Sequence, residues 1–250
     1  MQNLSTHSRT ALITGVSRSL GLGFAVARQL AEKHYHVILA ARDESQAEKL
    51  ASELRNAGHQ ATALCLDLAE RSSIHNAVDR LAGITHRLDV LVNNASAMPD
   101  FAARSAIEVD LDALYSAFEV SVLGCWALIQ LSLPLLRRAS AARIVNVSSA
   151  AALQIGVHGT DPLFSPAYSL AKYTLNALTA TLAAALADTP MLINAVDPGR
   201  FSSHPERGDD ADEPSPADAA RVIVWAATLD ARGPSGSLIR DGKAVAGVAL

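Results

Sequence analysis

The stretch ALITGVSRSLGLGFAVA, residues 11–27, decides the fold. It starts with a short apolar run typical of a buried strand and ends with apolar residues at helical spacing. The turn between them contains Gly15, Gly21 and Gly23. A glycine-bearing turn of this kind exposes backbone N–H groups at a helix N-terminus, where the helix dipole favours a pyrophosphate. Taken alone, the turn is a weak signal, because a tight helix-capping turn without a ligand is the alternative interpretation.

The same order of strand and helix continues along the chain. Strands are expected at residues 11–14, 36–41, 61–66, 88–93, 143–148, 191–196 and 237–240, and helices at 20–33, 44–57, 71–85, 112–138, 166–187 and 216–229. This alternation predicts an α/β fold, a single doubly wound parallel sheet of the Rossmann type with helices on both faces. The length of 250 residues fits one catalytic domain over residues 1–250.

Composition excludes several classes of function. The formal net charge is −4, which argues against a nucleic-acid or anionic-membrane partner. Residues 122–136 are apolar but interrupted by Gln130, Ser132 and Pro134, so a buried helix is expected rather than a membrane span. Cys65 and Cys125 have no partner at metal-ligand spacing, and the start of the chain lacks a signal-peptide pattern. These features predict a cytoplasmic protein with reduced thiols and no metal site.

Two segments, 150–165 and 199–215, are too irregular for helices or strands. Long loops in compact domains are usually functional, and in this fold they emerge where ligands bind. We therefore expect residues 199–215 to form a substrate lid. The acidic run at 209–213 is interpreted as a solvated face of that lid rather than a receptor for a cationic substrate.

A tyrosine and a lysine four residues apart carry the strongest chemical signal. Helical spacing puts Tyr168 and Lys172 on one face, where the ammonium can lower the phenol pKa from about 10 toward working pH. Ser149, at the end of the expected strand 143–148, can donate a hydrogen bond to a substrate carbonyl. We predict that Tyr168 is the acid/base, Lys172 its pKa tuner and Ser149 the group that orients the carbonyl.

These motifs resemble those of the short-chain dehydrogenase/reductase family over nearly the whole chain. Thr14, Gly15 and Gly21 match the family's TGxxxGxG, Tyr168 and Lys172 its YxxxK, and other matches are Asp67-Leu68, the NNAG-like 93–96 and the PGxxxT-like 198–203. The resemblance assigns Asp67 to the adenine amino group, Asn93 to the central strand and cofactor loop, and Lys172 to the ribose. It implies a cofactor site made of Gly15, Ser17, Arg18, Ser19, Leu20, Gly21, Arg42, Asp67, Leu68, Asn94, Ala95, Tyr168, Lys172, Pro198, Gly199 and Ser203.

The second strand indicates which dinucleotide is used. Ala41 stands where an acid for the ribose hydroxyls is expected, and Arg42 follows it. Arg42 and Arg18 could hold a 2′-phosphate between two guanidinium groups, which favours NADP(H) over NAD(H). Alternatively, Arg42 is only a surface residue preceding the helix-capping pair Asp43-Glu44.

Three small departures from the family pattern are all serines. Ser19 replaces the middle glycine, Ser96 the last residue of NNAG, and Ser121 the family's fourth catalytic residue, asparagine. Ser121 is predicted to help hold a water that links Lys172 to solvent, unless its hydroxyl merely bonds back to its own helix. The departures leave open a non-catalytic NADP-binding sensor or assembly module, and a hydro-lyase or epimerase is a third alternative.

Apolar residues near the expected site favour a largely apolar ketone or aldehyde as the carbonyl (or alcohol) substrate. They are Met98, Pro99, Phe101, Leu153, Phe164 and Phe201. His158 and His204 lie in the two loops and either touch substrate or are ordinary surface histidines. Helices 112–138 and 166–187 resemble the family's oligomer interface, so a homodimer or homotetramer is expected, although the domain's own core could cover both faces.

Overall fold

Eight strands form one sheet, in the order β3-β2-β1-β4-β5-β6-β7-β8, in this computed structural model, which describes residues 8–155, 163–204 and 212–245. The strands are β1 (Thr10–Thr14), β2 (His36–Ala41), β3 (Ala61–Cys65), β4 (Val90–Asn93), β5 (Arg143–Val147), β6 (Leu192–Asp197), β7 (Leu238–Arg240) and β8 (Lys243–Ala244). All pairs are parallel except β7 and β8. The antiparallel β8 was not predicted, because it is two exposed residues long and carries no apolar pattern.

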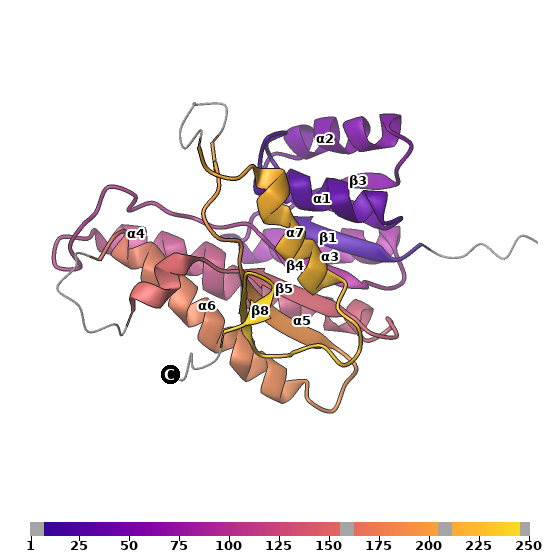
Figure 1. The fold of residues 1–250 in the computed structure, drawn as a ribbon. Coiled ribbons are helices and arrows are strands. Elements are labelled where there is room, and N and C mark those ends of the chain that lie inside the picture. Colours follow the sequence, from indigo (N-terminus) through magenta and orange to yellow (C-terminus); the bar gives the residue numbers. More distant parts are fainter. Residues whose placement is uncertain (1–7, 156–162, 205–211, 246–250) are drawn as a thin grey trace, which may run out of the picture.

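Helices cover both faces of the sheet (Figure 1). One layer contains α1 (Leu22–Glu32), α2 (Glu44–Asn56) and α7 (Pro216–Ala227). The other contains α3 (Arg71–Ile84), α4 (Leu111–Phe118), α5 (Cys125–Leu136) and α6 (Pro166–Ala185). Each helix layer forms a hydrophobic core with one face of the sheet. Within β1, Ala11 and Ile13 pack into the core under α1, α2 and α7, and Leu12 packs into the core on the opposite face, because successive side chains of a strand point to opposite faces. The predicted doubly wound architecture is confirmed.

The point where the strand order reverses lies at β1. This strand pairs with β2 on one side and with β4 on the other, and the chain leaves both β1 and β4 at the same edge of the sheet. Connections that depart in opposite directions from neighbouring parallel strands leave a crevice at their carboxyl ends. The glycine turn follows β1 directly, so it lines this crevice.

The helix expected over residues 112–138 is interrupted by a π-helical segment, η1 (Glu119–Gly124), between α4 and α5. A Cβ on Gly124 would lie 2.2 Å from the Leu68 carbonyl oxygen, so only glycine allows this approach. The run Leu111–Leu136 is long and apolar enough to cross a membrane, but 50% of its most apolar window is buried within the fold. A core helix of a globular domain has the same properties, and Leu128 and Ile129 are fully buried here.

The segment predicted to be irregular after β5 starts with a 3₁₀ helix, η2 (Ala150–Gln154). Ser149 is its N-cap, and the Ser149 hydroxyl oxygen accepts a hydrogen bond from Ala151 N at 3.2 Å. His158 and residues 205–211 of the expected lid lie outside the described residues.

Candidate active site

A cavity of about 690 Å³ opens at the carboxyl ends of the central strands. Most residues predicted for the cofactor and for catalysis line it: Gly15, Ser17, Arg18, Gly21, Arg42, Asp67, Leu68, Asn94, Ala95, Ser149, Tyr168, Lys172, Pro198, Gly199 and Ser203. Three predicted residues are not in its lining. Ser19 and Leu20 are exposed in the glycine turn, and Ser121 is buried outside the cavity lining.

The glycine turn forms a cradle that side chains would fill. Gly15 has a φ of +73°, and a Cβ there would lie 2.7 Å from the Ala95 Cα. Gly23, to which the sequence assigned no role, also leaves little space, because a Cβ there would lie 2.7 Å from Asn94 Nδ2 and 3.0 Å from the Gly15 carbonyl oxygen. Gly21 is the N-cap of α1 and offers no side-chain acceptor to the first N–H groups of the helix. This open helix start beside a cavity has the chemistry of a phosphate site.

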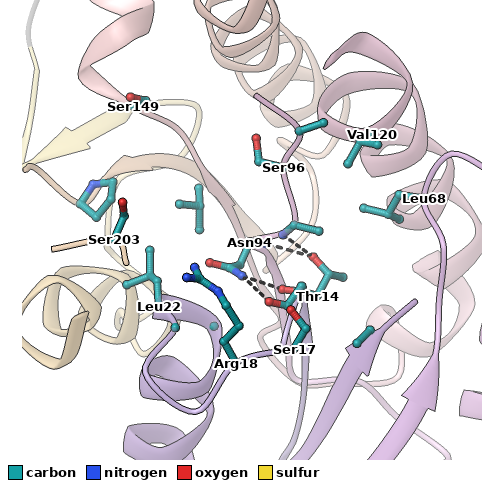
Figure 2. Close-up of a pocket in the computed structure, with 18 of the residues that line it drawn as sticks. Thr14, Ser17, Arg18, Leu22, Leu68, Asn94, Ser96, Val120, Ser149 and Ser203 are labelled. Atoms are coloured by element: carbon teal, nitrogen blue, oxygen red, sulfur yellow. Dashed lines mark hydrogen bonds between the residues drawn. The ribbon is translucent and has the colours of Figure 1, made fainter. Parts of the chain in front are cut away.

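Asn94 connects the ends of β1 and β4 (Figure 2). Its Nδ2 donates to the Thr14 carbonyl at 2.8 Å, and its backbone N donates to Thr14 Oγ1 at 3.0 Å. The backbone N of Ala95 also donates to Thr14 Oγ1, at 3.0 Å. Asn93, expected to hold the cofactor loop, instead donates to Asn146 Oδ1 on β5 at 2.8 Å. The loop part of that assignment is corrected, because Asn94 holds the loop, while Asn93 joins two central strands, as the other part of the assignment implies.

Arg18 crosses the cavity instead of pointing toward the second strand. Its Nη1 lies 2.5 Å from Nδ1 of His204, in the segment after β6, and Figure 2 shows its side chain rising away from the turn. Arg42 is exposed at the opposite, β2 end of the lining. The two guanidinium groups expected to share a 2′-phosphate thus have different environments, and His204, a predicted substrate contact, bonds to Arg18.

The proposed catalytic groups come from α6 and the end of β5. Lys172 is 2% exposed, and its Nζ donates to the Val147 carbonyl at 2.7 Å. The same Nζ lies 5.5 Å from the centroid of the Tyr168 ring. Because the Ser149 oxygen already accepts the Ala151 N–H, its own O–H can donate toward a ligand.

The pKa of Tyr168 is shifted in the direction opposite to the prediction. Burial raises the pKa of the Tyr168 phenol above its ordinary value, the Ser149 hydroxyl lowers it, and the Asp197 carboxylate raises it further. Burial of the Lys172 amine lowers its pKa from 10.5 to about 8. The phenol is therefore protonated at neutral pH, as a proton donor must be.

Two of the three departures from the family pattern are in contact. Ser96 lines the cavity, and its Oγ lies 3.1 Å from Oγ of Ser121 in η1. Neither sequence-based interpretation of Ser121 anticipated this partner. The two serines join the loop after β4 to the π-helical segment whose Val120 also lines the cavity.

Sequence reasoning missed Asp197, a buried carboxylate at the end of β6. It is 1% exposed and lines the cavity. Its Oδ1 accepts a hydrogen bond from Gly199 N at 3.0 Å, and its Oδ2 lies 3.6 Å from Arg240 Nε. A carboxylate after a strand and before Pro-Gly is the only signal that could have identified it.

Among the six apolar residues predicted to face substrate, Phe201 lines the cavity. Met98, Phe101 and Phe164 are exposed at 41%, 70% and 49%, and Leu153 is partly buried. Pro99 lines a separate, shallower hollow beside α4. Of these six side chains, Phe201 is the one that lines the cavity in the described residues.

Comparison with known proteins agrees with this geometry. The sequence model of the short chain dehydrogenase family matches residues 9–213. Oxidoreductase UcpA of Salmonella typhimurium is 31% identical over 86% of this chain and 78% of its own length. A 3-oxoacyl-[acyl-carrier-protein] reductase of rhamnolipid biosynthesis from Pseudomonas aeruginosa is 31% identical over 81% of this chain and 77% of its own.

Solved structures share the fold over most of their length. A short chain dehydrogenase from Escherichia coli CFT073, solved in complex with NADPH, superposes with a TM-score of 0.82 at 25% identity, covering 93% of this chain and 95% of that one. The family match, the relatives and the cavity at the end of β1 together show that this chain belongs to the short chain dehydrogenase family of oxidoreductases.

Proposed function

We propose that this chain is an NADP(H)-dependent carbonyl reductase that uses Tyr168 as its proton donor. The observation that carries the proposal is the meeting of Ser149, Tyr168 and Lys172 in the cavity that begins at the glycine turn. Phosphate binding and proton donation need different groups, and here both sets line one continuous space.

The cavity suits a dinucleotide. Gly15, Gly21 and the start of α1 would hold the pyrophosphate, Asp67 the adenine, and the backbone after β6 the carboxamide. The cofactor, when bound, supplies a hydride to the carbonyl carbon. Arg42 supports NADP(H), since a guanidinium beside the ribose attracts a 2′-phosphate, and the Escherichia coli relative was solved with NADPH.

The chain's own groups account for the proton. Ser149 donates a hydrogen bond to the carbonyl oxygen and holds it beside the Tyr168 hydroxyl. Tyr168 then gives its proton to that oxygen. The buried Lys172, anchored on the Val147 carbonyl, holds a positive charge next to the phenolate that remains.

Substrate, assembly and compartment follow as proposals. Phe201, which lines the cavity, favours a largely apolar ketone or aldehyde. Leu111, Tyr115, Leu123 and Trp126 leave an apolar strip exposed along α4, η1 and α5, which supports a homodimer or homotetramer. The free thiols of Cys65 and Cys125 support a reducing compartment such as the cytoplasm.

The test is NADPH oxidation with panels of aldehydes, ketones and quinones. Tyr168→Phe should lower turnover about 10²–10⁴-fold on any substrate that the parent reduces, with NADPH affinity nearly unchanged. Tyr173→Phe, five residues along the same helix, is the control and should keep its activity. Full turnover by Tyr168→Phe refutes the proton donor, while NADPH binding without reduction of any carbonyl favours the non-catalytic module.

A further inference from the structure

The helix that carries Tyr168 and Lys172 starts without a cap of its own. Its N-cap, Ser165, is in the left-handed region with φ 46° and ψ 63°, and its side chain makes no capping hydrogen bond. The first hydrogen bond within the helix runs from Ser169 N to the Ser165 carbonyl, so the N–H groups of Ala167 and Tyr168 need acceptors from outside. Unpaired N–H groups at a buried helix start are unfavourable.

Asp100 supplies both acceptors from a distant segment. Its Oδ2 accepts the Ala167 N–H at 2.6 Å and its Oδ1 accepts the Tyr168 N–H at 3.3 Å. Asp100 is 67 residues before Ala167 in the chain and only 6% exposed. A carboxylate at this position also matches the positive end of the helix dipole.

Neighbouring contacts hold the same two segments together. Ser165 N donates to the Ala103 carbonyl at 3.1 Å, and Ala103 N donates to the Asp100 carbonyl at 2.9 Å. The Arg104 guanidinium lies over the Phe164 ring, 4.7 Å from its centroid. The chain after β4 therefore holds the beginning of α6 at several points, and the Asp100 bond alone reaches the backbone of Tyr168.

We propose that Asp100 is a positioning residue for the reaction, which holds the Tyr168 hydroxyl in place against Ser149 by fixing the backbone N–H of Tyr168. This inference rests on the proposed function, since it assigns a partner to the proposed proton donor. The loop that carries Asp100 leaves β4 through Asn94 and Ala95, which line the cavity. One short segment thus connects the cofactor cradle with the proton donor. A displacement of about 1 Å at a reacting group can cost about a hundredfold in rate.

A merely stabilising cap would have different consequences, and the chain offers a matched comparison. Asp110 caps α4, where its Oδ1 accepts the Asp112 N–H at 3.0 Å. In the described cavity, α4 contributes no lining residue. Asp110→Ala therefore removes the carboxylate cap of a helix that packs against α6 but contributes no residue to the cavity lining, and Asp110 makes no hydrogen bond to the backbone of Tyr168 in the described residues.

The experiment compares Asp100→Ala, Asp100→Asn and Asp110→Ala by steady-state kinetics and by amide hydrogen exchange of the folded protein. Asp100→Ala should lower kcat about 10- to 100-fold, with KM and NADPH affinity within about twofold of the parent. Exchange at the Ala167 and Tyr168 amides should accelerate in the same variant. Asp100→Asn keeps an acceptor oxygen and should recover most of kcat, while Asp110→Ala should keep parental kcat.

The outcomes separate this inference from the proposed function. A parent that reduces no carbonyl contradicts the proposed function, whereas an active parent whose Asp100→Ala variant keeps kcat within twofold overturns the role of Asp100. Equal losses in Asp100→Ala and Asp110→Ala would also overturn it, because a general loss of stability would then explain both. If Asp100→Ala does not fold, Asp100→Glu takes its place, because the longer side chain displaces the carboxylate. An Asp100→Glu variant with unchanged kcat and unchanged amide exchange at Tyr168 would contradict the proposal.

Discussion

Replacing Lys172 with methionine should make the cofactor-free chain more stable at neutral pH. The amine is buried, and burial lowers its pKa from 10.5 to about 8. That change in proton affinity corresponds to a cost of about 3 kcal/mol for keeping the charged amine folded, at about 1.4 kcal/mol per tenfold change. Loss of the hydrogen bond to the Val147 carbonyl offsets about 1 kcal/mol. Lys172→Met should therefore gain about 2 kcal/mol at pH 7.

The gain should depend on pH in a defined direction. Below pH 8 the amine is charged in both folded and unfolded chains, so the parent bears the full cost. Between pH 8 and 10.5 the unfolded chain binds a proton that the folded chain does not, and the parent becomes more stable relative to the variant. The advantage of Lys172→Met should shrink through this window and change sign before its upper end, because the cost of about 3 kcal/mol for the charge is lost while the loss of about 1 kcal/mol from the hydrogen bond remains.

Urea unfolding of both proteins at pH 7, 8, 9 and 10 measures the effect. Groups that titrate alike in parent and variant cancel in the difference between their unfolding free energies. Lys33→Met, at an exposed lysine, is the control and should give a difference that does not change with pH. A difference for Lys172→Met that stays constant over this range would refute the argument that the buried charge destabilises the fold. The same variant should also bind NADPH more weakly, since Lys172 lines the cavity.

Three further predictions concern the cavity wall. If Arg42 holds a 2′-phosphate, the parent should bind NADPH about ten- to a hundredfold more tightly than NADH. Arg42→Asp should abolish or invert this preference, as measured by the two dissociation constants. Because the Asp197 carboxylate raises the pKa of Tyr168, Asp197→Asn should move the alkaline limb of the pH–rate profile to lower pH, and an unmoved limb would exclude that coupling. Ser121→Asn should destabilise by about 1–3 kcal/mol in thermal unfolding, because the larger side chain meets Ser96, and Ser96→Gly in the same chain should recover part of the loss.

Most of the fold was predictable because its strands are buried on both faces. A central parallel strand reads as a continuous apolar run, and the seven runs in the sequence correspond to β1 through β7 within two residues at each end. The exposed β8 has no such run. The π-helical segment η1 was missed for another reason: one extra residue in a helical turn barely disturbs apolar spacing, and the close approach of Gly124 to Leu68 is a tertiary contact.

Site residues that directly follow a strand could be predicted from the sequence. Contacts between side chains from distant segments could not. Parallel strands end at one edge, so motif residues after β1, β4, β5 and β6 line the same cavity. Pairings between distant segments, such as Ser96 with Ser121, depend on how loops are placed and leave no spacing signal. The direction of the Tyr168 pKa was mispredicted because spacing gives the neighbour at one helical turn but not the burial that dominates the shift.

Hydrogen bonds join α6 to the end of β5. Along α6, Lys172 bonds to the Val147 carbonyl, and the side chains of Asn176 and Thr179 bond to Ser148 and Asn146 at 2.7 and 2.8 Å. In the described residues on either side of 205–211, Arg200 Nε donates to Glu213 Oε1 at 2.7 Å and Ser202 N donates to the Pro214 carbonyl at 2.9 Å. Across the cavity, the Arg18–His204 bond connects side chains at the surface of the site. The bonds along α6 fix the position of this helix, and with it Tyr168 and Lys172, on the end of β5.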